Sequence, residues 1–448
     1  MSGPLQERRR SQMSDQERVR DFQRKLYQKA KREPDFRFYV LYDKIGLNHF
    51  LREAYRRVKA NGGSPGIDGV TFADIEASGI DKYLADISEE LKNRSYKPSA
   101  VKRVYIPKAN GQKRPLGIPT IKDRIVQMSC KLVIEPIFEA DFEESSYGFR
   151  PKRSPKDAVT EIKRNLKHGK AEVFDADLSQ YFDTIPHDKL LTVIGKRISD
   201  RNVIHLIKLW LKAPISEDGK MSGGKRNKLG TPQGGVISPL LANIYLHLVD
   251  RLINSKEMFR RLGIKIIRYA DDFILIGRHI PQEILDYVKR ILERMGLMLN
   301  LEKSRKVNAY KESFDFLGFT FRYDKGQIDW KKRYWHIEPG KRSQIKLREN
   351  IREYFKGYCY KALPEFIPGL NMILRGWMNY FHIPGVSYCR KTFKRMHWHL
   401  HKRFYFHYRK KSQKVSKLYR RYGFDGLVSR FGLIDPEKYI YQQRLVKA

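Results

Sequence analysis

The sequence predicts an α+β fold that is followed by a largely helical C-terminal region. Between Glu172 and about Phe321, short β-rich runs alternate with helical stretches, a pattern typical of helices packed on a sheet. Beyond Pro339, apolar residues recur at helical spacing. The chain has 448 residues, of which 41% are apolar and 12% aromatic, so it can bury cores and wholesale disorder is excluded.

The first hundred residues divide into two parts. Residues 1–35 are charged and poor in aliphatic side chains, and we expect a flexible or helical basic lead-in. Residues 36–100 show helical patterns interrupted by a turn-rich insert at 61–66, where glycines and a proline mark a loop. The N-terminal sequence has no apolar segment of a secretory signal, and its early acidic residues argue against an organellar transit peptide.

A β-hairpin is expected next. Strand-like sequence begins at Val101, and the pair Asn110-Gly111 lies between the apolar runs 104–106 and 116–118. A short apolar run on each side of an Asn-Gly pair is a strong local signal for two antiparallel strands.

The C-terminal region predicts two helices with apolar stripes. One stripe recurs at i, i+3, i+4 and i+7 from Ile351, and the second runs from Leu370 to Phe381. Pro364 and Pro368 with Gly369 are expected to separate these helices.

Charge is distributed unevenly in a chain with 90 Lys and Arg against 50 Asp and Glu, a formal net charge of +40. A surface this basic attracts a polyanion, and nucleic acid is the leading candidate. An anionic membrane surface is the weaker alternative, because no run of about 18 apolar residues could span a bilayer. We therefore expect nucleic-acid partners and no membrane.

The stretch 366–424 has no acidic residue, but it has 14 Lys and Arg and 14 aromatic residues. A solvated helical face usually mixes both signs of charge, so phosphates are the better explanation for this excess. Interleaved aromatic side chains could stack on unpaired bases. The candidate nucleic-acid contacts are Arg375, Lys391, Lys394, Arg395, Lys402, Arg403, Lys410 and Lys411. The histidines 397, 399, 401 and 407 lack zinc-site spacing and are expected to face RNA or stack on bases.

The number and spacing of the cysteines exclude a small domain held together by disulfides or by a zinc ion bound to cysteine pairs. Cys130, Cys359 and Cys389 are far apart in sequence, so they form neither a disulfide framework nor a paired zinc motif. Such sparse cysteine usage is consistent with a reducing cytosol.

Acidic residues occur where a strand would not ordinarily carry them. Asp175 and Asp177 alternate onto one face of a β-rich run, although Asp177 could also serve as a helix N-cap. Asp271 and Asp272 lie between two apolar β runs, at the tip of an expected hairpin. One turn Asp means little, but two adjacent carboxylates favour a bound divalent cation that relieves their repulsion.

If these two segments lie on neighbouring strands, Asp177 and Asp271 would hold two Mg²⁺ ions about 3.5–4 Å apart for in-line displacement at phosphorus. One ion would lower the pKa of the attacking 3′-hydroxyl, and the other would support the leaving pyrophosphate. Mn²⁺ is a possible substitute for Mg²⁺.

Several motifs in order along the chain resemble those of reverse transcriptases encoded by group II introns. Tyr269-Ala270-Asp271-Asp272 looks like their YxDD motif, in the YADD form common in bacterial members. The other resemblances are to the first palm motif (172–183), the PQGxxxSPxLxN motif (230–243), the fingers motif (108–127), the later palm motifs (299–304 and 316–319) and the GWxNYF signature of the maturase thumb, called domain X (376–381).

The resemblance implies a right-hand polymerase with antiparallel-sheet fingers and palm, then an α-helical thumb. Its expected parts are the lead-in at 1–35, an N-terminal extension and the start of the fingers at 36–100, fingers and palm at 101–335, thumb or domain X at 336–410, and a basic segment at 411–448 that could bind DNA or RNA. No cysteine pairs of an HNH endonuclease domain are seen.

The resemblance also implies a role for each matching residue. Asp177, Asp271 and Asp272 would be the palm carboxylates, with Asp177 and Asp271 the direct metal ligands. The expected nucleotide-binding residues are Lys108 and Arg114 on the triphosphate, Gln233 against the nascent base pair, and Lys303 near the pyrophosphate. Gly62 and Gly63, in the glycine-rich loop, would touch the template, although a plain loop is nearly as good an explanation.

Phe182, five residues after Asp177, occupies the place of an aromatic steric gate in this family. Such a ring excludes the ribose 2′-hydroxyl, so the resemblance implies a preference for dNTPs. A core phenylalanine is the alternative.

The function implied is copying RNA into DNA, together with binding the protein's own intron RNA to promote splicing and intron mobility. The implied partners are group II intron RNA, an RNA-template/DNA-primer duplex, dNTPs and target DNA, in a bacterial cytoplasmic ribonucleoprotein associated with the nucleoid. The alternatives are a free-standing reverse transcriptase used in repair or defence, and a splicing cofactor that has lost catalysis.

Overall fold

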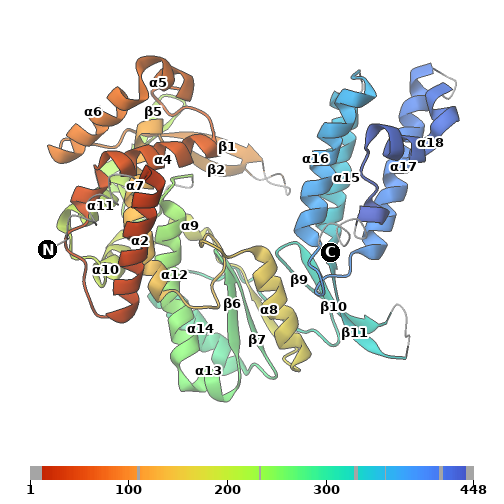
Figure 1. Ribbon diagram of the computed structural model, residues 1–448. Helices are drawn as coiled ribbons and strands as arrows, with labels where there is room; N and C mark the ends of the chain where they lie inside the picture. Colours follow the sequence, from red (N-terminus) through yellow and green to blue (C-terminus); the bar gives the residue numbers. More distant parts are fainter. Residues whose placement is uncertain are drawn as a thin grey trace. The chain divides into compact units, whose positions relative to one another are not determined.

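The computed structural model describes residues 13–107, 111, 113–231, 234–326, 331–358, 360–412 and 417–439. The chain divides into two compact units (Figure 1). The first comprises residues 1–153, 175–275 and 280–305, and the second comprises 154–174, 276–279 and 306–448.

The first unit begins with helices that pack on one long buried helix. The elements are α2 (Asp15–Arg32), α3 (Tyr42–Ile45), α4 (Asn48–Asn61), α5 (Phe72–Ser78), α6 (Ile80–Lys92) and α7 (Ile121–Asp141). Ser14 caps α2 in a reciprocal pair of hydrogen bonds with Glu17, which satisfies N–H groups that the helix leaves unpaired. The Gln23 amide donates to the Leu132 carbonyl at 2.9 Å, so the described part of the basic lead-in is a helix attached to α7.

The predicted hairpin is confirmed. Strands β1 (Val101–Pro107) and β2 (Lys113–Ile118) pair antiparallel, with Val104 opposite Leu116, and Asn110 lies outside the described residues. The sheet has the order β2-β1-β4-β5, where β4 is Pro214–Glu217 and β5 is Lys220–Gly223.

A second sheet has the order β6-β7-β3-β8. Its strands are β3 (Glu172–Ala176), β6 (Lys265–Tyr269), β7 (Asp272–Gly277) and β8 (Arg305–Asn308). The sequence separates β3 from β7 by almost a hundred residues, and the sheet makes them neighbours. The remaining helices of the first unit are α9 (Tyr181–Thr184), α10 (His187–Gly195), α11 (Arg201–Leu211), the 3-10 turn η1 (Gly224–Arg226), α12 (Ser238–Ser255), α13 (Glu257–Arg261) and α14 (Gln282–Arg294).

The second unit combines a small sheet with a layer of helices. Its sheet has the order β11-β10-β9, and its helices include the predicted C-terminal pair. The elements are α8 (Pro155–Lys167), β9 (Phe314–Phe316), β10 (Phe319–Lys325), β11 (Arg333–Pro339), α15 (Lys341–Gly357), α16 (Leu363–Phe381), α17 (Arg390–Ser412) and α18 (Lys417–Phe431). Phe319 and Phe321 of the central strand β10 and Phe314 of the edge strand β9 are fully buried.

The prediction that two prolines and a glycine separate the C-terminal helices is wrong. Pro364 lies in the first turn of α16, where the missing N–H costs no helical hydrogen bond, and Pro368 continues the same helix. Gly369 is accommodated there for a steric reason, since a Cβ at this position would collide with the Tyr354 hydroxyl. The helices are instead separated between Gly357 and Leu363.

The expectation that the histidine cluster faces RNA is also wrong for two of its members. His397 Nδ1 lies 2.8 Å from Asp435 Oδ1, and the His407 ring stacks on Phe366 within the helical layer. His399 is half-buried, and this burial lowers its pKa to about 4. His397 and His407 thus contact other residues of the second unit.

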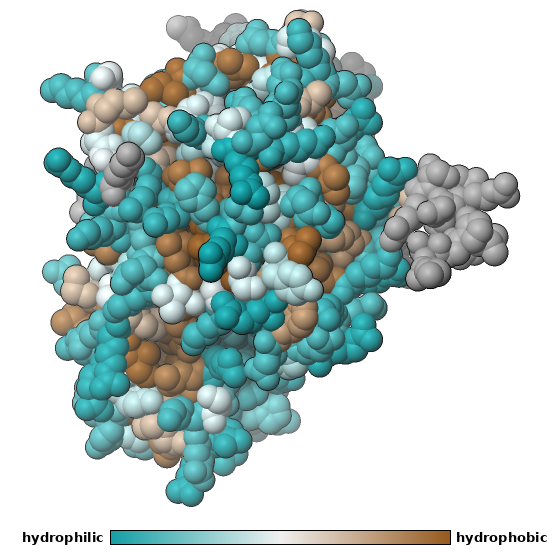
Figure 2. Space-filling view, turned by 90° about the vertical axis from the view of Figure 1, so that its left-hand side faces the viewer, coloured by the Kyte–Doolittle hydropathy of each residue, from teal (hydrophilic) through white to brown (hydrophobic). Residues whose placement is uncertain are grey.

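Polar residues dominate the face shown in Figure 2, with hydrophobic residues visible in smaller areas between them. Of the helices within the described ranges, none is long and apolar enough to cross a membrane. Cys130 and Cys389 are buried and unbridged, and Cys359 is not among the described residues.

Candidate active site

The turn between β6 and β7 carries the two adjacent carboxylates in a constrained backbone. β6 ends at Tyr269 and β7 begins at Asp272, while Ala270 adopts a left-handed conformation with φ of 58°. The turn packs directly on Gly148, where a Cβ would collide with the Ala270 amide nitrogen. The turn therefore depends on a small residue in a different segment of the first unit.

A fully buried arginine, Arg268, holds this turn in place through hydrogen bonds. Arg268 Nη1 donates to the Ala270 carbonyl at 2.8 Å and to Asn243 Oδ1 at 2.8 Å. Its Nε and Nη2 bind the buried carboxylate of Asp250, with Nη2 at 2.6 Å. The Asn243 amide donates in turn to the Gly148 carbonyl at 2.8 Å. One hydrogen-bonded network thus positions both sides of the turn.

Sequence reasoning missed this network. The available signal was an arginine inside the apolar run 264–269, because a buried charge requires a paired acid. Its partner Asp250 lies on α12, eighteen residues earlier, and nothing in the spacing identifies it. Asn243 belongs to a motif recognised from the sequence, but no role had been assigned to it.

Asp177 follows the end of β3 and is held against a later segment of the chain. Its carbonyl accepts a hydrogen bond from the Asn300 N–H at 2.8 Å, and its own N–H donates to Ser304 Oγ at 3.1 Å. Lys303 Nζ lies 3.3 Å from Asp177 Oδ2. The backbone pairing therefore places the predicted lysine beside the predicted metal ligand.

The carboxylates influence one another electrostatically. Burial raises the pKa of Asp271, and the negative charge of Asp177 adds to this shift. Asp272 retains exposed surface, but desolvation by the surrounding protein raises its pKa to about 7, with further repulsion from Asp271, Asp177 and Asp175. The structure thus brings Asp177 together with the turn at 269–272, as the sequence predicts.

Positive charges oppose this acidic centre. Lys303 lowers the pKa of Asp272, and Arg114 on β2 lowers the pKa of Asp271. Arg114 was predicted to bind the triphosphate and Lys303 to lie near the pyrophosphate, and the charges of both act on the carboxylates. Lys108, the other predicted triphosphate contact, lies outside the described residues.

The donor set fits a hard divalent cation. Oxygen ligands are those that Mg²⁺ prefers, and Mg²⁺ is commonly held by one or two carboxylates together with substrate phosphates. Within the described residues no group of three or more His, Cys, Asp or Glu is arranged to hold a metal. The repulsion that raises the pKa of Asp271 and Asp272 is the feature that a cation would relieve.

The predicted nucleotide gate lies on the short helix that follows Asp177. Phe182, on the short helix α9, is half-buried, and its carbonyl accepts a hydrogen bond from the Thr231 N–H at 2.7 Å. The neighbouring Tyr181 is fully enclosed, and burial raises its pKa well above the usual value, with a contribution from Asp271. Gln233 lies outside the described residues, although the segment before it is tied to Phe182.

A cavity of about 400 Å³ adjoins the segment after Gln233. The glycine-rich loop, the end of β2 and the loop at 234–236 all line it, so three recognised motifs meet there. Gly234 has φ of 110°, and a Cβ on it would collide with the Gly117 carbonyl. Gly62 and Gly63, the predicted template contacts, are part of the lining.

The second unit presents a basic face on α17. Lys391, Lys394, Arg395 and Lys402 are exposed, and Arg403 is partly exposed. Trp398 and Phe406 keep 53% and 52% of their surface exposed on the same helix, whereas its Phe393, Leu400 and Phe404 are fully buried. Arg375 on α16 is exposed, and the side chains of Lys410 and Lys411 are not described.

Comparison with known proteins agrees with this geometry. The family described as reverse transcriptase (RNA-dependent DNA polymerase) matches residues 106–321, and the group II intron maturase-specific domain matches 345–423. Protein YkfC of Escherichia coli is 35% identical over a match that covers 67% of this chain and 87% of YkfC. The chain therefore belongs to the family of group II intron reverse transcriptases and maturases.

Two longer relatives share part of their length with this chain. The group II intron-encoded protein LtrA of Lactococcus lactis subsp. cremoris is 36% identical, covering 58% of this chain and 41% of LtrA. An uncharacterized 91 kDa protein in the cob intron of Schizosaccharomyces pombe is 29% identical, covering 73% and 49%. The chain thus spans less than half of each. Its own domains are those of an RNA-directed DNA polymerase with a right-hand α+β fold and of a splicing maturase.

Proposed function

We propose that the protein copies RNA into cDNA at a centre built from Asp177, Asp271 and Asp272, with Asp177 and Asp271 the direct ligands of two Mg²⁺ ions. The observation that supports this best is that β3, which Asp177 follows, and β7, which begins at Asp272, are neighbouring strands of one sheet although they are distant in sequence. When bound, the ions activate the 3′-hydroxyl and stabilise the leaving pyrophosphate, and Mn²⁺ could substitute.

The residues around the acids then orient the nucleotide. Arg114 and Lys303 bind the triphosphate and the pyrophosphate, helped by Lys108, because their charges already act on the carboxylates. Phe182 and Gln233 contact the sugar and the nascent base pair. Gly62 and Gly63 allow close approach of the template backbone, since neither carries a Cβ.

We assign the maturase role to the basic face of α17 and to Arg375, where intron RNA would bind. Lys410 and Lys411 lie at the end of this helix. Exposed lysines neutralise phosphates there, and the exposed aromatic rings accept unpaired bases. We propose group II intron RNA and target DNA as the partners, in a nucleoid-associated ribonucleoprotein of the bacterial cytoplasm. We propose a basic lead-in at 1–35, an N-terminal extension and the start of the fingers at 36–100, and fingers and palm at 101–335. The thumb or domain X would follow at 336–410, and a basic segment at 411–448.

Primer extension on an RNA template with dNTPs and Mg²⁺ tests the polymerase assignment. Asp177→Asn is expected to lower the rate by about a thousandfold, since a bound metal supplies several kcal/mol of transition-state stabilisation. Asp218→Asn is the matched control, because Asp218 lies in the β4–β5 turn with a φ of 47° that Asn tolerates.

The outcomes separate the alternatives. No product from the wild-type chain would leave a splicing cofactor without catalysis. Product together with faster splicing of the intron RNA supports both roles. Product without any effect on splicing, and no ribozyme flanking the gene, would point to a free-standing reverse transcriptase.

A further inference from the structure

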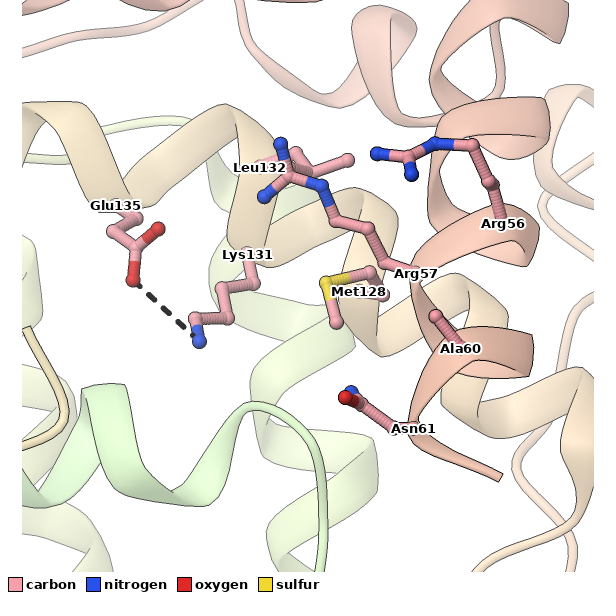
Figure 3. A pocket seen from close by; sticks show the side chains of 8 residues that line it. All are labelled: Arg56, Arg57, Ala60, Asn61, Met128, Lys131, Leu132 and Glu135. Carbon is pink, nitrogen blue, oxygen red and sulfur yellow. Dashed lines mark ion pairs between the residues drawn. The ribbon is translucent and has the colours of Figure 1, made fainter. Parts of the chain in front are cut away.

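A second cavity in the first unit is lined by basic side chains and lies between α4 and α7. Its volume is about 280 Å³, and Figure 3 shows its lining. Three cationic groups, Arg56, Arg57 and Lys131, surround an apolar floor formed by Ala60, Met128 and Leu132. Neither the catalytic centre nor the basic face of α17 includes any of these residues.

The two arginines are preorganised by one buried acid. Glu53 Oε2 accepts from Arg56 Nε at 2.7 Å, and Glu53 Oε1 accepts from Arg57 Nε at 2.6 Å. Glu53 is almost completely buried, while both arginines keep exposed surface. A single carboxylate thus fixes two guanidinium groups, and the contact to Arg57 uses only its Nε. Arg56 donates to Glu53 through Nη2 as well, at 2.9 Å, so Arg57 is the arginine whose two Nη groups can offer paired N–H donors to phosphate oxygens.

The opposite wall, from α7, adds a third cation. Lys131 lies 3.5 Å from Glu135 Oε1, and the Glu135 carboxylate sits on the side of Lys131 away from the arginines (Figure 3). Counting Glu53 and Glu135, the five charged groups carry one net positive charge. Because the Lys131 ammonium turns toward Glu135, the cavity favours an anion beside the two arginines, with Lys131 on the opposite wall (Figure 3).

This cavity adjoins the cavity of about 400 Å³ that is lined by Gly62, Gly63 and Gly234. Asn61, the last residue of α4, lines both the cavity of about 280 Å³ and that of about 400 Å³. The larger cavity continues past Gly62 and Gly63 to Gly234. The two cavities therefore meet at the end of α4, so a strand that leaves the larger one past Asn61 would next encounter the basic one.

We propose that the Arg56–Arg57–Lys131 cavity binds backbone phosphate of the unpaired RNA template before it is copied. This assignment rests on the proposed polymerase function, because it takes Gly62, Gly63 and Gly234 as neighbours of the template. The apolar floor lies under the sugar or base of the nucleotide whose phosphate the cations hold. The site binds RNA independently of its sequence, because the cationic side chains contact phosphate oxygens and not the bases.

The test compares two primer–template substrates by fluorescence anisotropy over a range of salt. One has a blunt RNA/DNA duplex, and the other has the same duplex with a long 5′ RNA overhang. Arg57→Gln and Lys131→Gln change opposite walls of the cavity. Arg52→Gln is the matched control, because Arg52 lies on α4 one turn earlier and pairs with Asp81 outside the cavity.

In the wild type and Arg52→Gln, the overhang is expected to tighten binding. In each cavity variant this advantage falls severalfold, and the slope of log affinity against log salt for the overhang substrate becomes shallower by about 0.7, as for one lost phosphate contact on a single strand. An unchanged advantage, or an equal loss on both substrates, would overturn the proposal. Primer extension by the wild type on the same substrates reports separately on the polymerase function.

Discussion

Asp272 is surrounded by carboxylates that make its own ionisation costly. Its pKa rises from the ordinary 3.8 to about 7 because of desolvation and repulsion from Asp271, Asp177 and Asp175. Between these two pH values the unfolded chain has released this proton while the folded chain still holds it. The metal-free protein is therefore expected to lose stability from this group as the pH rises from about 4 to 7.

A bound divalent cation would remove that penalty. We expect Mg²⁺ to raise the midpoint of thermal unfolding more at pH 8 than at pH 5, because the carboxylates are ionised at the higher pH. In Asp272→Asn the pH dependence without metal should be flatter. Differential scanning fluorimetry measures both effects. An equal stabilisation by Mg²⁺ at the two pH values would contradict this prediction.

Phe182 is the residue assigned to sugar discrimination. Phe182→Ala is expected to raise the incorporation of ribonucleotides relative to dNTPs, since the ring that would meet the 2′-hydroxyl is removed. Phe182→Tyr keeps the ring and should keep the preference. Single-nucleotide incorporation with matched dNTP and NTP measures the ratio. If the alanine variant keeps the wild-type preference, Phe182 is a packing residue.

At the scale of elements, the β6–β7 turn owes its position to helix α12. Asp250 and Asn243 of α12 bind Arg268 of β6, and Arg268 binds the carbonyl of Ala270. Strand pairing alone would allow the turn to adopt several conformations. The buried arginine selects one of them, because its donors need all of these acceptors.

Asp250→Leu tests this dependence. The substitution leaves Arg268 buried without its counter-charge, and breaking such a pair costs about 3–5 kcal/mol. Chemical denaturation measures the loss in free energy of unfolding, and primer extension should fall with it. The control is Arg261→Gln, which breaks an exposed pair with Glu257 and should cost about 0.5 kcal/mol or less. Comparable effects of the two variants would exclude a special role for the network.

At the scale of the whole molecule, the excess of positive charge serves binding more than folding. The net charge of +40 has to be balanced by counterions or by phosphates. In the second unit the cations of α17 lie on one face, while its opposite face is core. The helix can therefore gain phosphate contacts without repacking.

The affinity for intron RNA is expected to fall steeply with salt. Each phosphate neutralised contributes about −0.7 to −0.9 to the slope of log affinity against log salt. Replacing Lys391, Lys394 and Lys402 together by Gln should make the slope shallower by that amount for each lost contact, without changing the melting temperature. Filter binding across a salt series measures the slope. If the RNA affinity of the wild type does not change with salt, its positive charges do not bind RNA phosphates as proposed.

The sequence was sufficient wherever a signal is local. The hairpin at 101–118, the carboxylate turn and the apolar stripes of α15 and α16 depend on neighbouring residues, and the structure places them as predicted. Pro364 and Pro368 misled the prediction, because a proline usually breaks a helix interior but is tolerated in a first turn, as Pro364 is in α16, whereas Pro368 lies inside α16 and the helix continues through it. Which of these applies depends on where the helix begins.

By itself, the sequence determined the class of fold, the basic character and the carboxylates that carry the proposed chemistry, because composition and motif order are properties of the chain. Only the tertiary structure decided which distant residues meet: Asp250 with Arg268, Lys303 with Asp177, and Arg56 and Arg57 with Lys131 across a cavity. These contacts depend on how helices and strands pack. The spacing of residues along the sequence does not show how these elements pack.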